Sequence, residues 1–299
     1  MVPLRELGKV GILGLGGAFS RVDQVGYLKA IEERGIVPFC MTAVSVATFN
    51  FAGYLQYGSR GLELIWSGLS GDGGKQKEMR SIEDRGPKYI FDIFNPKTLA
   101  NIVLLKPHIL TNVGVQDLSR RFDPLKLIDS PVKLNIVVFN HETRGTEMFS
   151  NRDELIRSNP DILKQAILAS VSPRGVFPPV YIQKNPKGPA VEYSDAITFG
   201  VRSLFDDGCD TVFVFRSRSS THKVAKNQSW LSSMLGLHSQ ASNILLDEVL
   251  SFYKGKVIEF SLEEGVSTLT YTNFKKGDLS KTIDLAYKRA LEILDDLNV

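Results

Sequence analysis

Hydrophobic and polar positions divide the chain into short apolar runs and longer stretches with helical spacing. Short apolar runs are typical of strands buried in a parallel sheet, because such strands are covered on both faces. They occur at residues 9–13, 37–44, 134–139, 180–182, 211–215 and 256–260. Apolar residues three or four positions apart predict helices at residues 25–34, 46–55, 161–169 and 282–297. Asn159 or Asp161 is the expected cap of the third helix.

The alternation of strands and helices indicates an α/β fold. Residues 59–130 are less regular, but partial helical periodicity at 96–105 and 118–127 predicts a helical insertion or flap over the sheet. No internal repeat or linker separates these segments. We therefore predict one domain over residues 1–299.

Composition and charge exclude some classes of function. The chain has 299 residues, a net charge of +3 and 43% hydrophobic residues, which is ordinary for a globular protein. Nucleic-acid binding is not expected, because it usually requires a concentrated basic stripe. The densest basic segment, residues 216–226, is interpreted as a solvated loop, with a phosphate contact as the alternative. Cys40 and Cys209 lie in or beside apolar segments, and their spacing suggests neither zinc nor a disulfide framework.

The first six residues lack the hydrophobic region of a signal peptide. No run of about 18 apolar residues is long enough to span a membrane. We expect a cytoplasmic protein that makes at most peripheral membrane contact. Secretion without a cleaved signal is an open alternative.

A glycine turn follows the first predicted strand, with Gly14, Gly16 and Gly17 ahead of a helix. A dinucleotide fingerprint would need a third glycine where Phe19 stands, and an acidic residue about 20 positions later, which is absent. Backbone N–H groups at such a turn can instead stabilise an oxyanion. A plain tight turn is the third interpretation.

The segment Ala43–Ala47 places Ser45 between two small residues, directly after a predicted strand and before a predicted helix. A nucleophilic serine on a strand-to-helix elbow needs small residues two positions away on each side, because the backbone there is strained and crowded. Such a serine needs a base. No histidine of the chain lies in the late loop that usually supplies it, but an aspartate within hydrogen-bond reach can take that role.

Further motifs follow the glycine turn and the serine segment. One is an Ala-Ser segment that ends in Phe-Pro-Pro, and another is an aspartate followed by a helix and a strand. In order, the four occupy residues 14–36, 43–50, 166–180 and 193–212. In this order and spacing the chain resembles the patatin-like phospholipase family, acyl hydrolases with a Ser–Asp dyad, over roughly residues 9–216.

The resemblance implies a three-layer α/β/α fold with a central, mostly parallel sheet. It implies that Ser45 is the nucleophile and Asp195 the base, and that the amides of Gly16, Gly17 and Ala18 stabilise the oxyanion. It implies no metal and no organic cofactor. The expected partners are a lipid or other acyl-ester substrate, a membrane surface, and either further copies of the chain or an activating protein.

The motifs differ from the family pattern at positions that are usually glycine. Alanine stands at Ala43 and Ala47 in the elbow, at Ala18 in the oxyanion loop and at Ala196 after the aspartate. The basic residue of the loop, Arg21, comes one position late. These changes leave both reacting side chains in place.

Three interpretations therefore stay open. In the first, Ser45 and Asp195 form a working dyad that cleaves a carboxylic ester of a lipid, in the manner of a phospholipase A. In the second, the fold survives as an inactive pseudoenzyme that binds lipid, another protein or copies of itself. In the third, Ser45 is a buried helix-start serine and Asp195 a surface cap.

Two minor candidates complete the picture. His141 follows a predicted strand, where it could face the site, although a hydrogen-bonded loop histidine is the simpler interpretation. Phe51, Tyr54 and Tyr57 could line an acyl pocket, but apolar residues on such a helix more often belong to the core.

Overall fold

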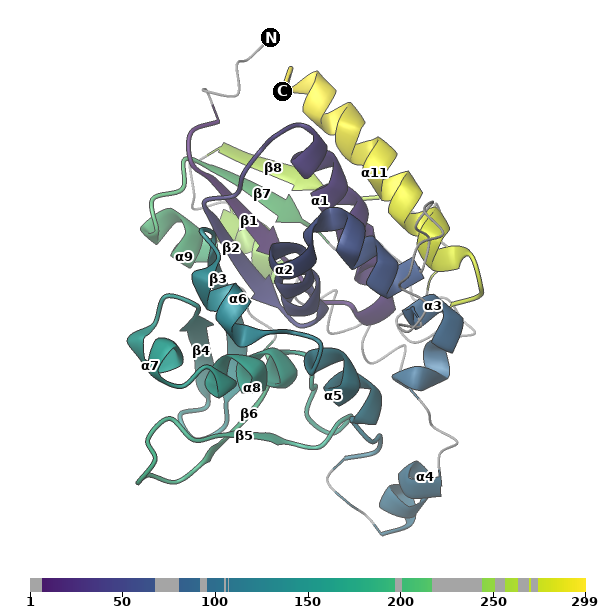
Figure 1. Cartoon of the computed structure of the whole chain (residues 1–299), viewed down its shortest axis with the longest axis vertical. Coiled ribbons are helices and arrows are strands. Elements are labelled where there is room, and N and C mark those ends of the chain that lie inside the picture. The colour runs from purple at the N-terminus through teal and green to yellow at the C-terminus, as the bar shows by residue number, and fades with distance from the viewer. Residues whose placement is uncertain are drawn as a thin grey trace.

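The strands join into a single sheet in the computed structural model of the protein (Figure 1). The structure describes residues 7–67, 81–91, 96–104, 106, 108–196, 201–216, 244–250, 256–262, 269 and 274–299. Within these, the strands are β1 (Val10–Gly14), β2 (Cys40–Val44), β3 (Lys133–Asn140), β4 (Gly145–Ser150), β5 (Val180–Ile182), β6 (Val191–Asp195), β7 (Thr211–Phe215) and β8 (Lys256–Phe260).

The sheet order is β5-β6-β3-β2-β1-β7-β8, with β4 paired to β3. Strands β1, β2, β3, β7 and β8 pair in parallel, whereas β4, β5 and β6 join through antiparallel pairs. The predicted α/β fold with a central, mostly parallel sheet is confirmed.

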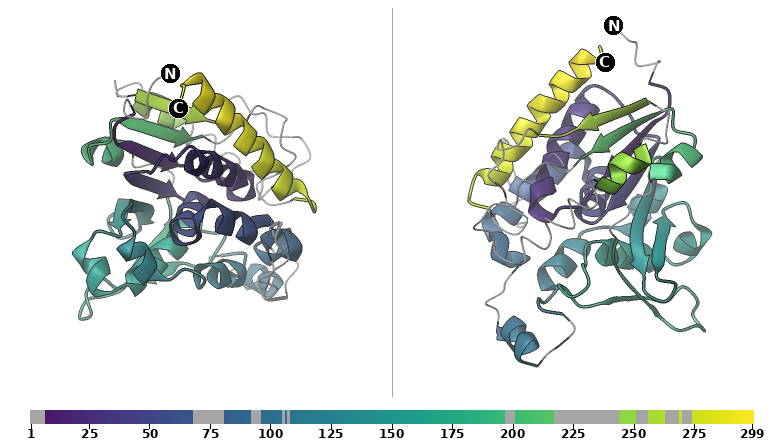
Figure 2. Two further views of the ribbon diagram at one scale, coloured as in Figure 1. Left: turned by 45° about the horizontal axis from the view of Figure 1, so that its top comes forward. Right: turned by 180° about the vertical axis from the view of Figure 1, so that it is seen from behind.

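Helices cover both faces of this sheet (Figures 1 and 2). One layer holds α1 (Asp23–Glu33), α2 (Val46–Ser67) and α11 (Asp278–Asp296), and the other holds α9 (Val201–Asp206) and the helical residues 244–250. Ile12 and Phe213 pack into the cluster of the first layer, while their neighbours Leu13 and Val212 pack into that of the second. Burial on both sides explains why these strands are apolar at every position.

One of the remaining described helices precedes the insertion, and the others lie within it or follow it. They are η2 (Ala18–Val22), α3 (Ile82–Arg85), η3 (Pro87–Tyr89), α4 (Pro96–Val103), α5 (Val113–Ser119), α6 (Pro124–Asp129), α7 (Glu154–Ser158) and α8 (Asp161–Ser170). The described residues between 59 and 130 are helical or irregular, as predicted, and contain no strand.

Several predicted boundaries are wrong. The helix expected over 118–127 is two helices, because Pro124 starts α6 and the Asp123 side chain caps it by accepting from the Leu125 N–H at 3.0 Å. Neither Asn159 nor Asp161 caps α8, since its N-cap residue is Pro160. Helix α2 continues past residue 55 to Ser67, with a kink at Gly58, where φ is +70°.

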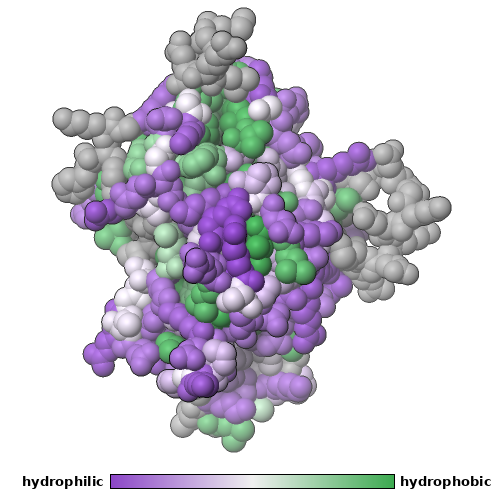
Figure 3. All heavy atoms as spheres, turned by 60° about the vertical axis from the view of Figure 1, so that its left-hand side comes forward, coloured by the Kyte–Doolittle hydropathy of each residue, from purple (hydrophilic) through white to green (hydrophobic). Residues whose placement is uncertain are grey.

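Strand β2 begins at Cys40 rather than at residue 37. Val37 and Phe39 are exposed on either side of Pro38, which has no N–H group for a sheet ladder. Figure 3 shows one face of the molecule, where hydrophobic residues form separate patches between hydrophilic ones. Several sequence features lie outside the described residues: Ile197, His222, His238 and the basic segment after Arg216.

Candidate active site

Strands β2 and β6 share one edge of β3 and run toward each other along it, because β4 occupies the opposite edge. Strand β2 is parallel to β3 and pairs with it as far as Val137, the partner of Val44. Strand β6 is antiparallel, and its last residue, Asp195, pairs with the next position, Val138. Ser45 directly follows β2. The register of the sheet therefore brings Ser45 and Asp195 face to face.

Ser45 lies on a tight elbow between β2 and α2. Its φ is +59°, in the left-handed region, which costs a non-glycine residue about 1–2 kcal/mol. Strain of this kind is concentrated at functional sites.

The alanine at position 47 fits the elbow because the facing residue of β1 is Gly14. A Cβ on Gly14 would lie 2.6 Å from the Ala47 Cβ and 2.6 Å from the Phe51 ring. In the sheet, Gly14 is also the partner of Ala43. Glycine at position 14 on the neighbouring strand therefore makes room for the alanine in the elbow.

Ser170, at the end of α8, holds the elbow from the opposite side. Its buried hydroxyl accepts the Ser45 N–H at 3.0 Å and donates to the Val137 carbonyl at 3.0 Å. The Thr48 hydroxyl lies 2.9 Å away and donates to the same oxygen, since the Ser170 proton is already engaged. Ser170 is the serine of the Ala-Ser segment at residues 166–180, and the sequence alone predicted no role for its side chain.

The glycine turn lies directly against the nucleophile. A Cβ on Gly16 would be 2.5 Å from the Ser45 Cβ and 3.0 Å from its Oγ, so only glycine fits there. The next two residues, Gly17 and Ala18, have φ values of +143° and +48°. Ala18 is therefore a second strained residue beside the first.

A chain of buried polar side chains fixes this loop. Gln24 donates to the Leu15 carbonyl at 2.8 Å, and Asn50 donates to the Gln24 side chain at 2.8 Å. Asn50 in turn accepts from the Trp66 indole at 2.9 Å. Arg21 is 1% exposed and donates to the carbonyls of residues 215 and 216 at the end of β7. Arg21 thus connects the loop to the end of β7, and it does not line the pocket.

Asp195 is the only charged side chain among the described residues that line the pocket. Its Oδ1 is buried and has no hydrogen-bond partner among those residues. Burial raises the pKa of Asp195 well above its usual range, and hydrogen bonds from the Ser45 hydroxyl and the Ala196 N–H offset this only in part. The carboxyl is therefore a stronger base than an exposed aspartate.

The pocket spans about 880 Å³ when the open solvent at its mouth is included, and about 90 Å³ of this is free for the centres of water-sized molecules. Gly16, Gly17, Ala18, Ser45 and Asp195 all line it, so the structure brings the five predicted site residues together. Its walls are apolar: Phe19, Val44, Val46, Phe49, Trp66, Ile82, Ile90, Phe91, Val115, Leu118, Val171, Pro173, Phe177 and Ala196.

Most of the walls come from segments that sequence reasoning did not assign to the site. Phe51, Tyr54 and Tyr57 do not line the pocket, whereas Phe49 and Trp66 of the same helix do. Helical spacing did not predict which aromatic residues of α2 line the pocket. The kink at Gly58 folds the second half of the helix back on the first, which brings Trp66 to the pocket.

His141 does not line the pocket either. Its Nε2 lies 2.9 Å from the Ser194 hydroxyl and 3.9 Å from Glu192, and burial lowers its pKa. In the described part of the chain, no three His, Cys, Asp or Glu side chains gather in a group that could hold a metal ion. No helix in that part has the length and apolar character needed to cross a membrane.

No protein-family model and no curated protein matches the chain by sequence. Among solved structures, the chain is similar to VipD from Legionella pneumophila, with 15% identity, a TM-score of 0.48, and coverage of 96% of this chain and 67% of that one. Another is a chain in the complex of full-length SpcU with full-length ExoU from the type III secretion system of Pseudomonas aeruginosa. It shows 12% identity, a TM-score of 0.35, and coverage of 96% of this chain and 52% of that one. This chain spans about half of that second chain, and neither similarity assigns an activity.

Proposed function

We propose that this protein is a serine-dependent acyl hydrolase of the patatin-like type, which cleaves carboxylic esters of lipids. One observation carries the proposal: the hydroxyl of the strained Ser45 is hydrogen-bonded to the Asp195 carboxyl, whose Oδ1 is buried, in an otherwise apolar pocket. A nucleophile hydrogen-bonded to a base of raised pKa is the arrangement that activates a hydroxyl.

In the proposed reaction, Asp195 takes the proton of the Ser45 hydroxyl as Oγ attacks the ester carbonyl carbon. The carbonyl oxygen becomes an oxyanion, which the backbone amides of Gly16, Gly17 and Ala18 stabilise. When the C–O bond to the alcohol breaks, Asp195 returns the proton to the leaving oxygen, and an acyl-enzyme remains. Water, deprotonated by Asp195, then attacks the acyl carbon. The bond from that carbon to Ser45 Oγ breaks as Asp195 returns the proton to Oγ, which releases a carboxylic acid and free Ser45.

The apolar walls support an acyl chain as the bound part of the substrate. Five aromatic rings and several aliphatic side chains can bury a hydrocarbon chain beside Ser45, at about 25 cal/mol per Å² of apolar surface removed from water. A polar acyl group would leave its own polar atoms unpaired against these walls.

Fluorophosphonate labelling of the purified protein tests the proposal, with the modified peptide mapped by mass spectrometry. We expect labelling at Ser45, none in Ser45→Ala, and slower labelling in Asp195→Asn. A folded wild-type protein that does not react would reject the proposal and favour the pseudoenzyme interpretation.

A further inference from the structure

One asparagine of α2, Asn50, holds both ends of the turn at residues 16–18. Its Nδ2 donates to the Arg21 carbonyl at 3.0 Å, just after the turn. The same nitrogen donates to the Gln24 side chain at 2.8 Å, and Gln24 donates to the Leu15 carbonyl at 2.8 Å, just before the turn. Asn50 therefore ties the residues on both sides of the proposed oxyanion amides to one point on α2.

The conformation of the turn depends on support of this kind. Gly17 and Ala18 have φ values of +143° and +48°, and strained backbone persists only where the surrounding structure determines it. Asn50 is 0% exposed, its Nδ2 makes two hydrogen bonds, and its Oδ1 accepts a third. A buried amide with these bonds is held rigidly, because movement would leave polar atoms unpaired.

The third partner of Asn50 belongs to the wall of the pocket. The Trp66 indole N–H donates to Asn50 Oδ1 at 2.9 Å, and Trp66 lines the same pocket as Ser45. Trp66 also meets the turn by a second route, because its ring stands edge-on to that of Phe19, with the ring centroids 6.4 Å apart. A side chain that an acyl group would touch is thus bonded to the residue that holds the turn.

We propose that Asn50 is a positioning residue, through which an acyl chain lying against Trp66 aligns the oxyanion amides with Ser45. The chain restricts the indole, the indole holds the Asn50 amide, and Asn50 fixes both ends of the turn. Binding energy from a part of the substrate remote from the reacting bond then raises the rate of reaction and not only the affinity. The inference rests on the proposed function, because it needs Ser45 to react with an acyl compound.

Phosphonylation of Ser45 measures this alignment in one chemical step. Two fluorophosphonates serve as probes, and they differ only in carrying a methyl or an octyl group on phosphorus, in the place of the acyl chain. The Oγ–P bond forms as the P–F bond breaks, Asp195 takes the hydroxyl proton, fluoride leaves, and the phosphoryl oxygen lies where the oxyanion would. For each probe, the rate constant at saturation and the half-saturating concentration are measured on the full chain.

The wild type should react with the octyl probe about tenfold faster than with the methyl probe at saturation, and should saturate at a lower octyl concentration. Trp66→Phe keeps a ring in the wall but removes the indole N–H, and Asn50→Ala removes all three hydrogen bonds. Both variants should lower the saturating octyl rate to near the methyl rate. The octyl probe should still saturate first, because the other apolar walls remain.

Asn151→Ala is the matched control for the loss of a buried asparagine. Asn151 is also 0% exposed, and its Nδ2 donates to the carbonyls of Leu127 and Val132 at 2.7 and 3.1 Å. Its Oδ1 accepts the Leu134 N–H at 2.9 Å, and it does not line the pocket. Asn151→Ala should therefore lose stability as Asn50→Ala does, but keep both saturating rates.

Equal saturating rates for the two probes in the wild type would overturn the inference, and so would an unchanged ratio of these rates in Trp66→Phe. An equal loss in Asn151→Ala would mean that lost stability explains the effect, which also rejects it. Thermal unfolding checks that each variant is folded, and Trp66→Phe decides the outcome if Asn50→Ala does not fold. A wild type that reacts with neither probe would reject the proposed function itself, so the two failures are distinguishable.

Discussion

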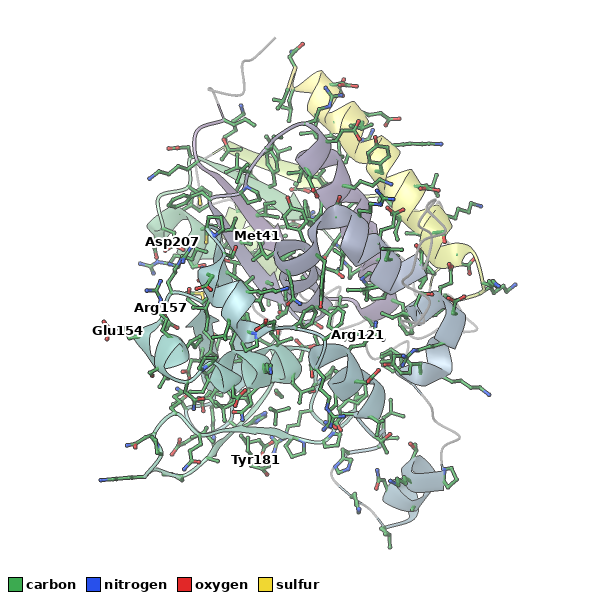
Figure 4. The ribbon with its side chains drawn as sticks, viewed as in Figure 1. Met41, Arg121, Glu154, Arg157, Tyr181 and Asp207 are labelled. Carbon is green, nitrogen blue, oxygen red and sulfur yellow. The ribbon has the colours of Figure 1, made fainter. Side chains whose placement is uncertain are left out.

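Two aspartates near opposite ends of β3 differ in their surroundings: Asp195 is the proposed base, and Asp207 makes contacts that stabilise the fold. Asp195 pairs with β3 near the end of the strand, where the pocket lies. Asp207, labelled in Figure 4, reaches the start of the strand and forms an ion pair with Lys133 at 2.5 Å. It also accepts from Asn135 and from the Cys40 thiol, each at 3.2 Å.

Different hydrogen-bond partners shift the pKa values of these two carboxyls in opposite directions. Burial by itself raises the pKa of Asp207, but hydrogen bonds from Lys133, Cys40 and Asn135 outweigh it and hold the pKa below its usual value. Among the described residues, the Asp195 carboxyl accepts only from the Ser45 hydroxyl and the Ala196 N–H, and its pKa is raised. A half-buried carboxylate with a cation partner therefore stabilises the fold, whereas one with only neutral partners lowers stability and gains basicity.

Replacing each aspartate by asparagine is the most direct test of whether the two carboxyls have different roles. We expect Asp195→Asn to lower kcat by about 10²–10⁴-fold, the usual contribution of a general base, and to raise the free energy of unfolding. Asp207→Asn should leave kcat unchanged and lower the free energy of unfolding by about 1–3 kcal/mol, because Lys133 loses its partner. Ester hydrolysis and chemical denaturation of both variants measure this. Similar effects of the two changes on kcat would contradict the assignment.

Gly14→Ala tests whether β1 makes room for the elbow. The added methyl would overlap Ala47 and Phe51, so we expect a loss of about 1–3 kcal/mol in the free energy of unfolding and a lower kcat. Ala47→Gly in the same chain should recover part of both. The double-mutant cycle is read from denaturation midpoints, and simple additivity would show that the two positions do not crowd each other.

The pH dependence should have opposite signs at the two ends of β3. The native state binds more protons than the unfolded state between the ordinary pKa of aspartate, about 4, and the raised pKa of Asp195. Asp195 therefore lowers stability as pH rises through that window, while kcat rises. Asp207 acts in reverse, because its stabilisation is lost as pH falls through its lowered pKa. Unfolding of the wild type and of each asparagine variant, measured at several pH values, should show that each variant lacks one of the two slopes.

Ala18→Gly should have the smallest effect. Glycine removes the strain of a φ of +48° but loses backbone entropy, so we expect a net gain of about 0.5 kcal/mol in stability. Arg144→Gly is the matched control, since Arg144 has a φ of +54° in the exposed turn after β3. Both variants should be stabilised, and only Ala18→Gly should change kcat. Thermal unfolding and ester hydrolysis distinguish these outcomes.

Local patterns predicted much of the scaffold. Strands β5, β7 and β8 have the predicted bounds, because their apolar runs end where burial ends. Strands β4 and β6 were missed, since Gly145–Ser150 is largely polar and β6 carries site residues instead of a regular alternation. The pocket walls from α3, α5 and the two residues after η3 were also missed, because partial helical periodicity does not tell which way a short helix faces.

The sequence by itself determined where most of the strands and helices form and that Ser45 follows a strand in an elbow of small residues, and it offered Asp195 as a candidate base. These features depend on the period of apolar residues and on local backbone strain, which neighbouring residues set. Only the tertiary structure decided that β2 and β6 meet on one edge of β3, that Gly14 makes room for Ala47, and that Asp195 has no cation beside it among the described residues. Each of these depends on strand register and on contacts between distant segments, and no local pattern encodes them.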